Sequence, residues 1–259
     1  MKKTLLLLTF LAVAGMSSNS AQAAKHYVSG FGGISWMNNM DASQVYQNAA
    51  PGEDYSTNTD LGSGLALTGA IGCDYGSYRL EGEVGYQTND VKSLGSVTNH
   101  VVDTWPTNAA GTTTTTRLAM RGDVSVLSLM GNGYYDFDLG SKVELYATAG
   151  IGVAQVSFHN VTNTNDAIDT GEETTNYTFP ANNNPGFNAH ETTLAWQVGA
   201  GIAAPIADNV KLDLRYRYFA TTDFTIATTQ PDGYGYTFTR EMNTNLSSHS
   251  VLLGLRVDF

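Results

Sequence analysis

The stretch VKLDLRYRYF, residues Val210–Phe219, alternates strictly between two kinds of side chain. One set of alternate positions is apolar or aromatic, and the other set carries the charged residues Lys211, Asp213, Arg215 and Arg217. Because successive side chains of a β-strand leave opposite faces, this pattern predicts a strand. The charged face would meet solvent in a soluble β-sandwich, whereas it would line the lumen of a membrane β-barrel whose apolar face contacts lipid. The rest of the chain decides between these two folds.

Residues 1–23 have the features of a cleaved signal peptide. Lys2 and Lys3 precede the apolar run Thr4–Ala14, and Ala21 and Ala23 fit the small-x-small cleavage pattern. The apolar run is roughly half of the ~20 residues that a membrane-spanning helix requires, so we expect export and not a helical anchor. The mature domain would then comprise residues 24–259.

Composition narrows the function classes. The formal net charge of −11 argues against nucleic-acid binding, which requires a basic surface. Cys73 is the single cysteine, so no internal disulfide can form. We expect no cofactor, because the histidines lack metal-ligand spacing and the glycines do not form a phosphate loop. A closed barrel in a bilayer would stabilise such a chain by pairing every backbone polar group.

Seven more segments are predicted to be strands: 26–34, 64–74, 78–87, 121–137, 142–157, 192–206 and 249–259. Tight turns alternate with four long polar connections, 36–62, 88–118, 158–191 and 221–247. Compact soluble domains rarely hold several long structureless loops, whereas outer-membrane barrels have this asymmetry. The sequence therefore predicts an all-β fold: an eight-stranded antiparallel up-and-down transmembrane β-barrel with short periplasmic turns and four long extracellular loops. Segments such as 174–179 could extend strands above the membrane.

The inward positions of the predicted strands are rich in charge. These positions are Arg79, Glu81, Glu83, Lys142, Glu144, Lys211, Asp213, Arg215, Arg217, Arg256 and Asp258. Acidic and basic residues are nearly balanced, and buried charges require partners. Because eight strands enclose just enough room for side chains, we expect an ion-pair network that fills the lumen. The alternative is a narrow channel with a charged constriction.

The last strand, VLLGLRVDF at Val251–Phe259, ends on an aromatic residue. Gly254, Val257 and Phe259 match the ending that the barrel assembly machinery reads, and Leu252 stands where a polar residue is usual. Together with the stretches 130–137 and 213–219, this ending resembles the OmpA-like/opacity-type outer-membrane β-barrel family of Gram-negative bacteria. The resemblance implies an outer-membrane location, an eight-stranded barrel, and porin-like, adhesive or antigenic roles.

Three functions remain open from the sequence. The first is a structural or porin-like barrel in contact with outer-membrane lipid and lipopolysaccharide. The second is a surface adhesin or antigen whose long loops bind a host or cell-surface ligand. The third is a lipid A-modifying activity, which we consider the least favoured of the three, since we expect the protein not to be an enzyme. Its candidate residues are His249 with Ser247, Ser248 and Ser250, and His190 with Glu191.

Overall fold

The structure is a computed structural model that describes residues 25–45, 54–100, 103–104, 107–108, 112–140, 142–167, 187–231 and 237–259. The predicted signal peptide, residues 1–23, and the segment 174–179 lie outside the described residues. Among the residues described, no helix has the length and apolar character needed to cross a bilayer.

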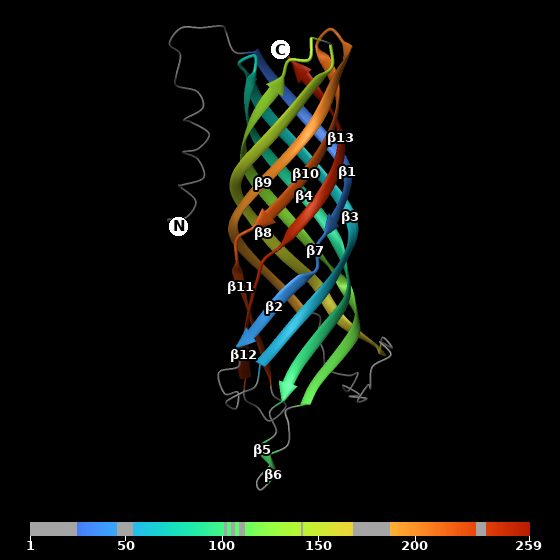
Figure 1. The fold of residues 1–259 in the computed structure, drawn as a ribbon, viewed down its shortest axis with the longest axis vertical. Helices are drawn as coiled ribbons and strands as arrows, with labels where there is room; N and C mark the ends of the chain where they lie inside the picture. Colours follow the sequence, from blue (N-terminus) through green and yellow to red (C-terminus); the bar gives the residue numbers. More distant parts are fainter. Residues whose placement is uncertain are drawn as a thin grey trace.

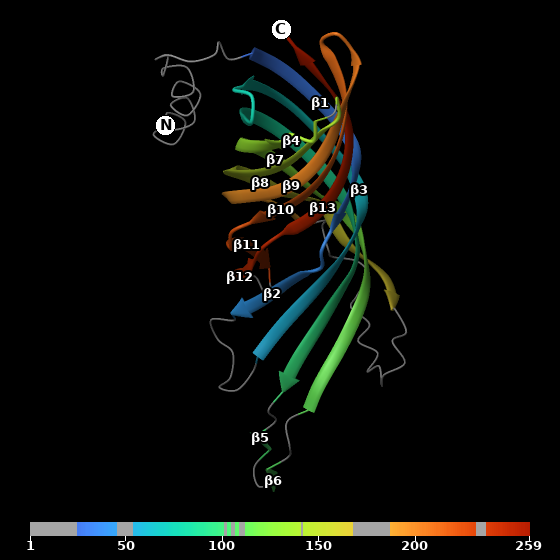
Figure 2. The same ribbon diagram turned by 45° about the horizontal axis from the view of Figure 1, so that its top comes forward.

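Eight antiparallel strands form a closed barrel (Figures 1 and 2). They are β1 (Lys25–Met37), β3 (Asp54–Asp74), β4 (Tyr78–His100), β7 (Thr112–Phe137), β8 (Glu144–Ala167), β9 (Phe187–Ala207), β10 (Val210–Thr221) and β13 (Ser247–Asp258). Each strand pairs with its neighbour in this order, and β1 pairs with both β3 and β13, which closes the ring. Closure leaves no unpaired sheet edge in this part of the wall. The predicted eight-stranded barrel is confirmed.

The strands are longer than the sequence predicts. β7 alone has 26 residues, whereas a tilted strand of about 9–11 residues crosses a bilayer. Three further strands continue the wall: β2 (Met40–Val45) follows β1, β11 (Phe224–Pro231) follows β10, and β12 (Thr237–Thr244) precedes β13. β11 pairs with β12, β12 pairs with β2, and β2 pairs with β3. The dipeptides β5 (Asp103–Thr104) and β6 (Thr107–Asn108) pair separately. Parts of all four predicted loops are therefore strand.

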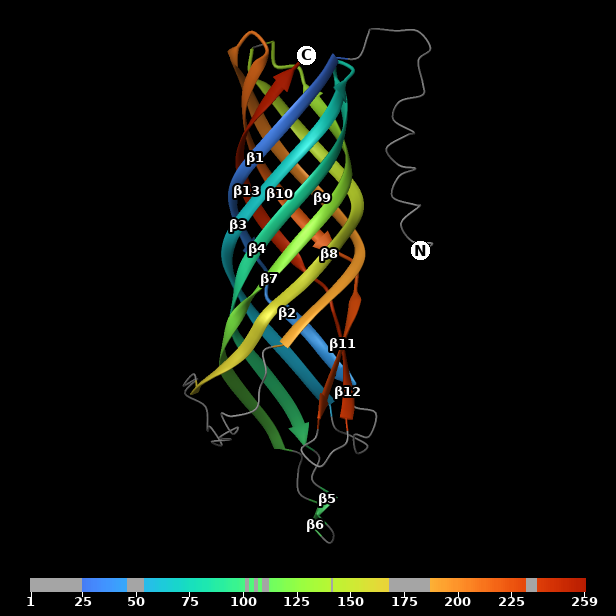
Figure 3. The same ribbon diagram turned by 180° about the vertical axis from the view of Figure 1, so that it is seen from behind.

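Two of the three short connections use glycine for a left-handed turn. Gly76 has a φ of 94°, and its N–H donates to the Asp74 carboxylate at 2.8 Å. Gly140 has a φ of 63°, and its N–H donates to the Asp138 carboxylate at 2.9 Å. The start of β1 and the carboxy terminus lie at the same end as these turns (Figures 1 and 3). This end is periplasmic, because outer-membrane barrels place their short turns there.

The two faces of β10 are those that the alternating sequence predicts. Leu212, Leu214 and Tyr216 are 41%, 46% and 47% exposed on the outer wall, while Arg215 and Arg217 are 2% and 3% exposed in the lumen. The other strands of the barrel continue the outward apolar surface with residues such as Ile71, Leu80, Val84, Ile151, Leu194, Ile202, Val251 and Leu253. An apolar belt around a polar interior is the arrangement that lipid requires.

Candidate functional site: the barrel interior

The periplasmic end of the lumen is closed by a cluster of four charged residues. Lys211 lies 2.5 Å from a carboxylate oxygen of Glu144 and 3.6 Å from one of Asp258. Arg256 pairs with Glu144 as well, and its Nε lies 3.8 Å from Asp258. These side chains come from β8, β10 and β13, so the cluster ties the wall together at the mouth of the barrel.

Further toward the middle of the barrel, two glutamates of β4, Glu81 and Glu83, accept hydrogen bonds from side chains on several other strands. Oε2 of Glu83 lies 3.0 Å from Nη1 of Arg215, and Oε1 of Glu83 lies 3.7 Å from Nη1 of Arg217. The amide of Gln197, on β9, also donates to Glu83 at 3.1 Å. Glu83 is completely buried, so these contacts replace the water that a carboxylate would otherwise bind.

The second glutamate, Glu81, is held mainly by tyrosine hydroxyls. Tyr134 donates to Glu81 at 2.5 Å and Tyr27 donates at 3.1 Å, while Arg215 lies 3.9 Å away. The hydroxyl of Tyr146 donates in the same way to Asp213 at 2.5 Å. Rings therefore fill space in the lumen while their hydroxyls satisfy buried carboxylates.

Arg79 forms a bidentate pair that the sequence analysis missed. Its Nε and Nη2 each lie 2.7 Å from an oxygen of Asp136, on the neighbouring strand β7. The guanidinium also lies 4.4 Å from the ring centroid of Tyr134 and 4.8 Å from that of Tyr146. The inward position of Asp136 follows from the alternation of β7, but it adjoins a predicted turn and was not counted.

Lys142 is the exception among the expected lumen residues. It precedes β8, its side chain is exposed, and no ion pair within the described residues includes it. The expectation that Lys142 lines the lumen is therefore wrong, because β8 begins at Glu144 and not at residue 142. The other ten expected positions face the interior or its periplasmic mouth.

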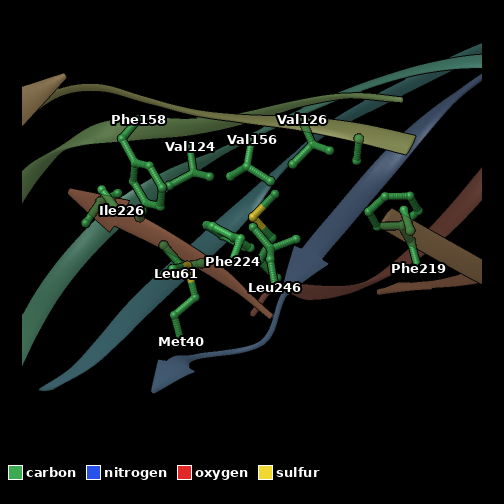
Figure 4. Packing of buried hydrophobic residues seen from close by; sticks show 14 of the residues in the cluster. Met40, Leu61, Val124, Val126, Val156, Phe158, Phe219, Phe224, Ile226 and Leu246 are labelled. Carbon is green, nitrogen blue, oxygen red and sulfur yellow. The ribbon is translucent and has the colours of Figure 1, made fainter. Parts of the chain in front are cut away.

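The extracellular half of the interior is apolar, which the sequence analysis did not anticipate. Inward side chains from strands all around the wall converge there, as Figure 4 shows. The cluster, which we call the apolar plug, consists of Met37, Met40, Leu61, Val91, Val124, Val126, Met130, Ala154, Val156, Phe158, Ala195, Phe219, Phe224, Ile226 and Leu246. Side chains packed in this way exclude water from the axis of the barrel.

A polar layer joins the two halves. Gln87 accepts a hydrogen bond from Arg217 at 3.2 Å and donates one to Ser248 at 3.1 Å. Further toward the extracellular side, Asn89 accepts from the Ser35 hydroxyl at 2.8 Å and is 1% exposed. Arg217 also reaches the apolar plug, because its guanidinium lies 5.7 Å from the ring centroid of Phe219, and it is paired there with Glu83 and Gln87.

Gly254, expected to belong to an assembly signal, also has a packing role. A Cβ added to Gly254 would lie 2.4 Å from a ring carbon of Phe31 and 2.3 Å from the carbonyl oxygen of Gly30. The Phe31 ring turns into the lumen at this point, where Arg215 stacks on it at 4.0 Å from the centroid. The missing side chain at position 254 therefore makes room for a residue that supports the ion-pair network.

The candidate catalytic residues are not brought together. On the outer wall, Nδ1 of His249 lies 2.6 Å from the Tyr216 hydroxyl, within hydrogen-bond distance, whereas Ser248 and Ser250 are fully buried on the inner face. His190 lies opposite Ser157 in the β8–β9 register. A histidine that does contact a serine is His159, whose Nε2 lies 3.0 Å from the Ser125 hydroxyl.

Within the described ranges, no group of three or more histidine, cysteine, aspartate or glutamate side chains is close enough to hold a metal ion. His159 pairs with Asp123 in the β7–β8 register, but among the described residues its ring forms a hydrogen bond with Ser125 and not with a carboxylate. A nucleophile–base pair needs such an orienting group. The arrangement thus suits a surface hydrogen bond better than acyl transfer.

Comparisons with known proteins agree with this architecture. A family model described as an outer membrane protein beta-barrel domain matches residues 4–259. The outer membrane protein PagN of Salmonella typhimurium is 27% identical over 140 residues, which cover 54% of this chain and 52% of PagN. The match thus spans about half the length of that curated relative.

Solved structures are similar at low identity. The outer membrane protein OprG of Pseudomonas aeruginosa is 10% identical, with a TM-score of 0.52, and the similarity covers 93% of this chain and 98% of OprG. Neisserial surface protein A is 16% identical, with a TM-score of 0.45 over 92% of this chain and all of that one. The chain is an outer-membrane protein and belongs to the outer membrane protein β-barrel domain family.

Proposed function

We propose that the protein is a closed, non-conducting barrel that serves as a rigid platform for contacts at the cell surface. The observation that carries this proposal is the two-part filling of the lumen. An ion-pair network occupies the periplasmic half and the apolar plug occupies the extracellular half. A solute would have to disrupt both layers in series. Local rotation of Arg215 or Glu83 could open only the first of them.

Conductance in planar bilayers tests the closed lumen. The natural protein is expected to give no stepwise openings. The variant Glu83→Gln/Arg215→Gln removes charge and leaves the apolar plug, so it should also stay closed. Adding Val126→Ser, Val156→Ser and Phe219→Ser should then permit openings, because both barriers are weakened. Discrete steps from the natural protein, or from the Glu83→Gln/Arg215→Gln variant, would contradict the proposal.

A role in surface contact is supported by the length of the extracellular wall. β2, β11 and β12 continue the barrel beyond the apolar belt, and β4 and β7 stay paired as far as His100 and Thr112. A paired wall holds the segments that it carries at a fixed distance from the membrane. Such a platform suits binding of a host or cell-surface ligand.

Deletion of the segments 101–111 and 168–186 tests this role. Each connects two long strands, so the barrel below should still fold and keep the difference in gel mobility between unheated and boiled samples. Binding of expressing cells to host cells or matrix should be lost. Retained binding by a variant with both deletions would refute the surface role and leave the closed-lumen proposal intact.

Enzymatic activity is not part of the proposal. The hydroxyls of Ser248 and Ser250 face away from His249, and His159 lacks a described orienting carboxylate contact. Lipid A should therefore be unchanged when the protein is overproduced. A modified lipid A that returned to normal with His249→Ala or His159→Ala would contradict this view.

We place the barrel assembly machinery among the partners. Val257 lies near the end of β13, and Phe259, the residue that follows this strand, is 71% exposed. Phe259→Ala keeps the hydrogen bond from the Phe259 N–H to the His26 carbonyl, so it should slow assembly in cells but leave refolding from urea into detergent nearly unchanged, because the ring is mostly exposed and its centroid lies 6.2 Å from that of His26. Equal losses in both assays would show a purely structural role.

A further inference from the structure

The outer wall of the barrel has a hollow in the periplasmic half of the apolar belt. It has a volume of about 380 Å³ and lies over β4, β7 and β8, which are neighbours in the wall (Figure 3). Tyr78 begins β4 just after the turn at Gly76, and Tyr135 lies near the end of β7, so the hollow is close to the periplasmic boundary of the membrane. The outward-facing residues that line it are Tyr78, Leu80, Gly133, Tyr135, Ala147 and Ala149.

Small residues on adjacent strands form the floor of this hollow. Gly133 pairs with Leu80 of β4 on one side and with Ala149 of β8 on the other. One step closer to the middle of the membrane, Gly131 of β7 pairs with Gly82 of β4. The backbone is therefore bare over part of three neighbouring strands.

The packing of the protein itself does not require these glycines. A Cβ added to Gly82 would meet nothing within 4 Å, and at Gly131 and Gly133 the nearest atom would be a carbonyl oxygen at 3.9 and 4.0 Å. By contrast, a Cβ at the inward-facing Gly201 would lie 2.3 Å from the Tyr146 ring. Glycine weakens a strand, and it often marks a place where a ligand or another backbone approaches closely. The outward glycines therefore point to an occupant outside the wall.

A packed aromatic ridge borders the hollow on its periplasmic side. The ring centroids of Tyr78 and Tyr135 lie 5.2 Å apart, and Phe137 packs edge-on against Tyr135 at 5.0 Å. All three side chains are exposed. Tyrosines at the end of a membrane span lie at the level of the lipid headgroups. The hollow is thus at acyl-chain depth in the periplasmic leaflet, which consists of phospholipid in an outer membrane.

We infer that this hollow binds one acyl chain of a phospholipid from the periplasmic leaflet. This goes beyond the proposed function, which concerns the lumen and the extracellular segments. Continuity with the lipid-facing belt identifies the occupant, because the hollow is part of the apolar surface that lipid covers. Its volume is within the range of small-ligand sites, ~300–1,000 Å³. Because lipid and wall are equally apolar, binding rests on dispersion and close packing.

A second copy of the barrel fits the hollow less well than an acyl chain does. Two copies in one membrane would be related by a two-fold axis, which brings the same patch of each copy together. One hollow would then face the other, and the space between them would stay unfilled. Such a dimer forfeits the contacts that a flexible chain makes with the floor.

Photolabelling in vesicles tests the site. The barrel is refolded into phosphatidylcholine vesicles with a small fraction of phosphatidylcholine that carries a diazirine halfway along one acyl chain, and labelled residues are mapped by mass spectrometry. Leu80 and Tyr135 should be labelled about fivefold more than the outer face of β13, an excess that corresponds to ~1 kcal/mol. Roughly ten additional carbon contacts account for such an excess. Equal labelling around the belt would overturn the inference.

Filling the hollow should remove the excess. Gly133→Leu places a side chain in the hollow, and Ala149→Leu does so from the neighbouring strand, so both should reduce the labelling of Leu80 and Tyr135 to that of β13. Gly69→Leu is the matched control and should keep the excess, because Gly69 faces outward with open space around an added Cβ but lies outside the hollow. Equal losses in Gly133→Leu and Gly69→Leu would contradict the site.

Folding and oligomeric state separate the remaining outcomes. Each variant should keep the urea midpoint of the natural protein and the difference in gel mobility between unheated and boiled samples, because the added side chains extend into open space. Ala149→Leu provides the comparison if Gly133→Leu does not fold. Sedimentation in detergent micelles measures the oligomeric state. A natural dimer that Gly133→Leu converts to a monomer, without excess labelling of the hollow, would show that a second copy is the occupant and would overturn the inference.

Discussion

Arg215 donates a hydrogen bond to Glu83 at 3.0 Å, and the two residues belong to strands that lie on opposite sides of the barrel. In the closed ring, β10 and β4 are separated by three strands in either direction. The pair therefore crosses the full width of the lumen. It links opposite sides of the wall, whereas the backbone hydrogen bonds link only adjacent strands.

Breaking this pair should be costly. Arg215→Met or Glu83→Met alone leaves a buried charge without its partner and should lower the free energy of unfolding by about 3–5 kcal/mol. The double variant should lose less than the sum, because both charges are removed together. Urea unfolding in detergent micelles measures all three variants. Lys142→Met, an exposed residue outside β8, should change stability by less than ~0.5 kcal/mol.

Additive losses in the double variant would mean that Arg215 and Glu83 do not act as a pair. A conductance increase in either single variant would contradict the apolar plug as the second barrier. These two outcomes concern different halves of the lumen, so they can be told apart.

Gly254→Ala tests the space reserved for Phe31. The added methyl group must displace the ring or the backbone of β1, and overpacking of this kind costs roughly 1–3 kcal/mol. Gly69→Ala is the matched control, since a Cβ at position 69 meets nothing within 4 Å. Urea unfolding should separate the two. Partial recovery in Gly254→Ala/Phe31→Leu would confirm the contact, whereas equal stability of the two glycine variants would argue against it.

The outer wall should reject charge according to depth. Leu214→Arg places a cation on the lipid face near the middle of β10 and should cost about 2–4 kcal/mol, whereas Thr88→Arg, beyond the apolar belt, should cost ~0–1 kcal/mol. Refolding yield and urea unfolding in phospholipid vesicles give both values. A tolerated Leu214→Arg together with a costly Thr88→Arg would reverse the assignment of the belt.

Turn glycines provide a test of the periplasmic end. Gly140→Ala should cost about 1–2 kcal/mol, because its φ of 63° is unfavourable for a residue with a Cβ. Gly82→Ala, where an added Cβ meets open space and the backbone is extended, should have a negligible effect. Thermal loss of the folded gel band compares them.

The sequence was sufficient for the barrel because lipid imposes a strict rule on alternation. β10 shows it most clearly from Leu212 to Arg217, where the apolar and aromatic residues face out and the charged residues face in. Strand ends were harder to place. Polar segments such as 88–100 pair above the membrane, where neither face must be apolar, so periodicity disappears although the backbone pairing continues.

The apolar plug could not be predicted from the sequence, for a related reason. Val126 faces in and Leu127 faces out, and both are apolar, so this part of β7 shows no contrast between its faces. Phe158 and Phe224 lie in segments that look like loops from their polar neighbours. The partners of Arg79 and Glu81 depend on the stagger between strands, because the stagger determines which inward residues meet. The pattern of a single strand does not contain this information.

Accessibility of position 126 to a water-soluble thiol reagent tests the closed, two-part lumen most directly. In a Cys73→Ser background, Val126→Cys is a small change at a side chain that is 1% exposed. The thiol should stay unmodified in the folded barrel and react fully in urea, while Lys142→Cys should react in both states. Rapid modification of Val126→Cys in the folded barrel would mean that water fills the extracellular half, and it would contradict the central claim.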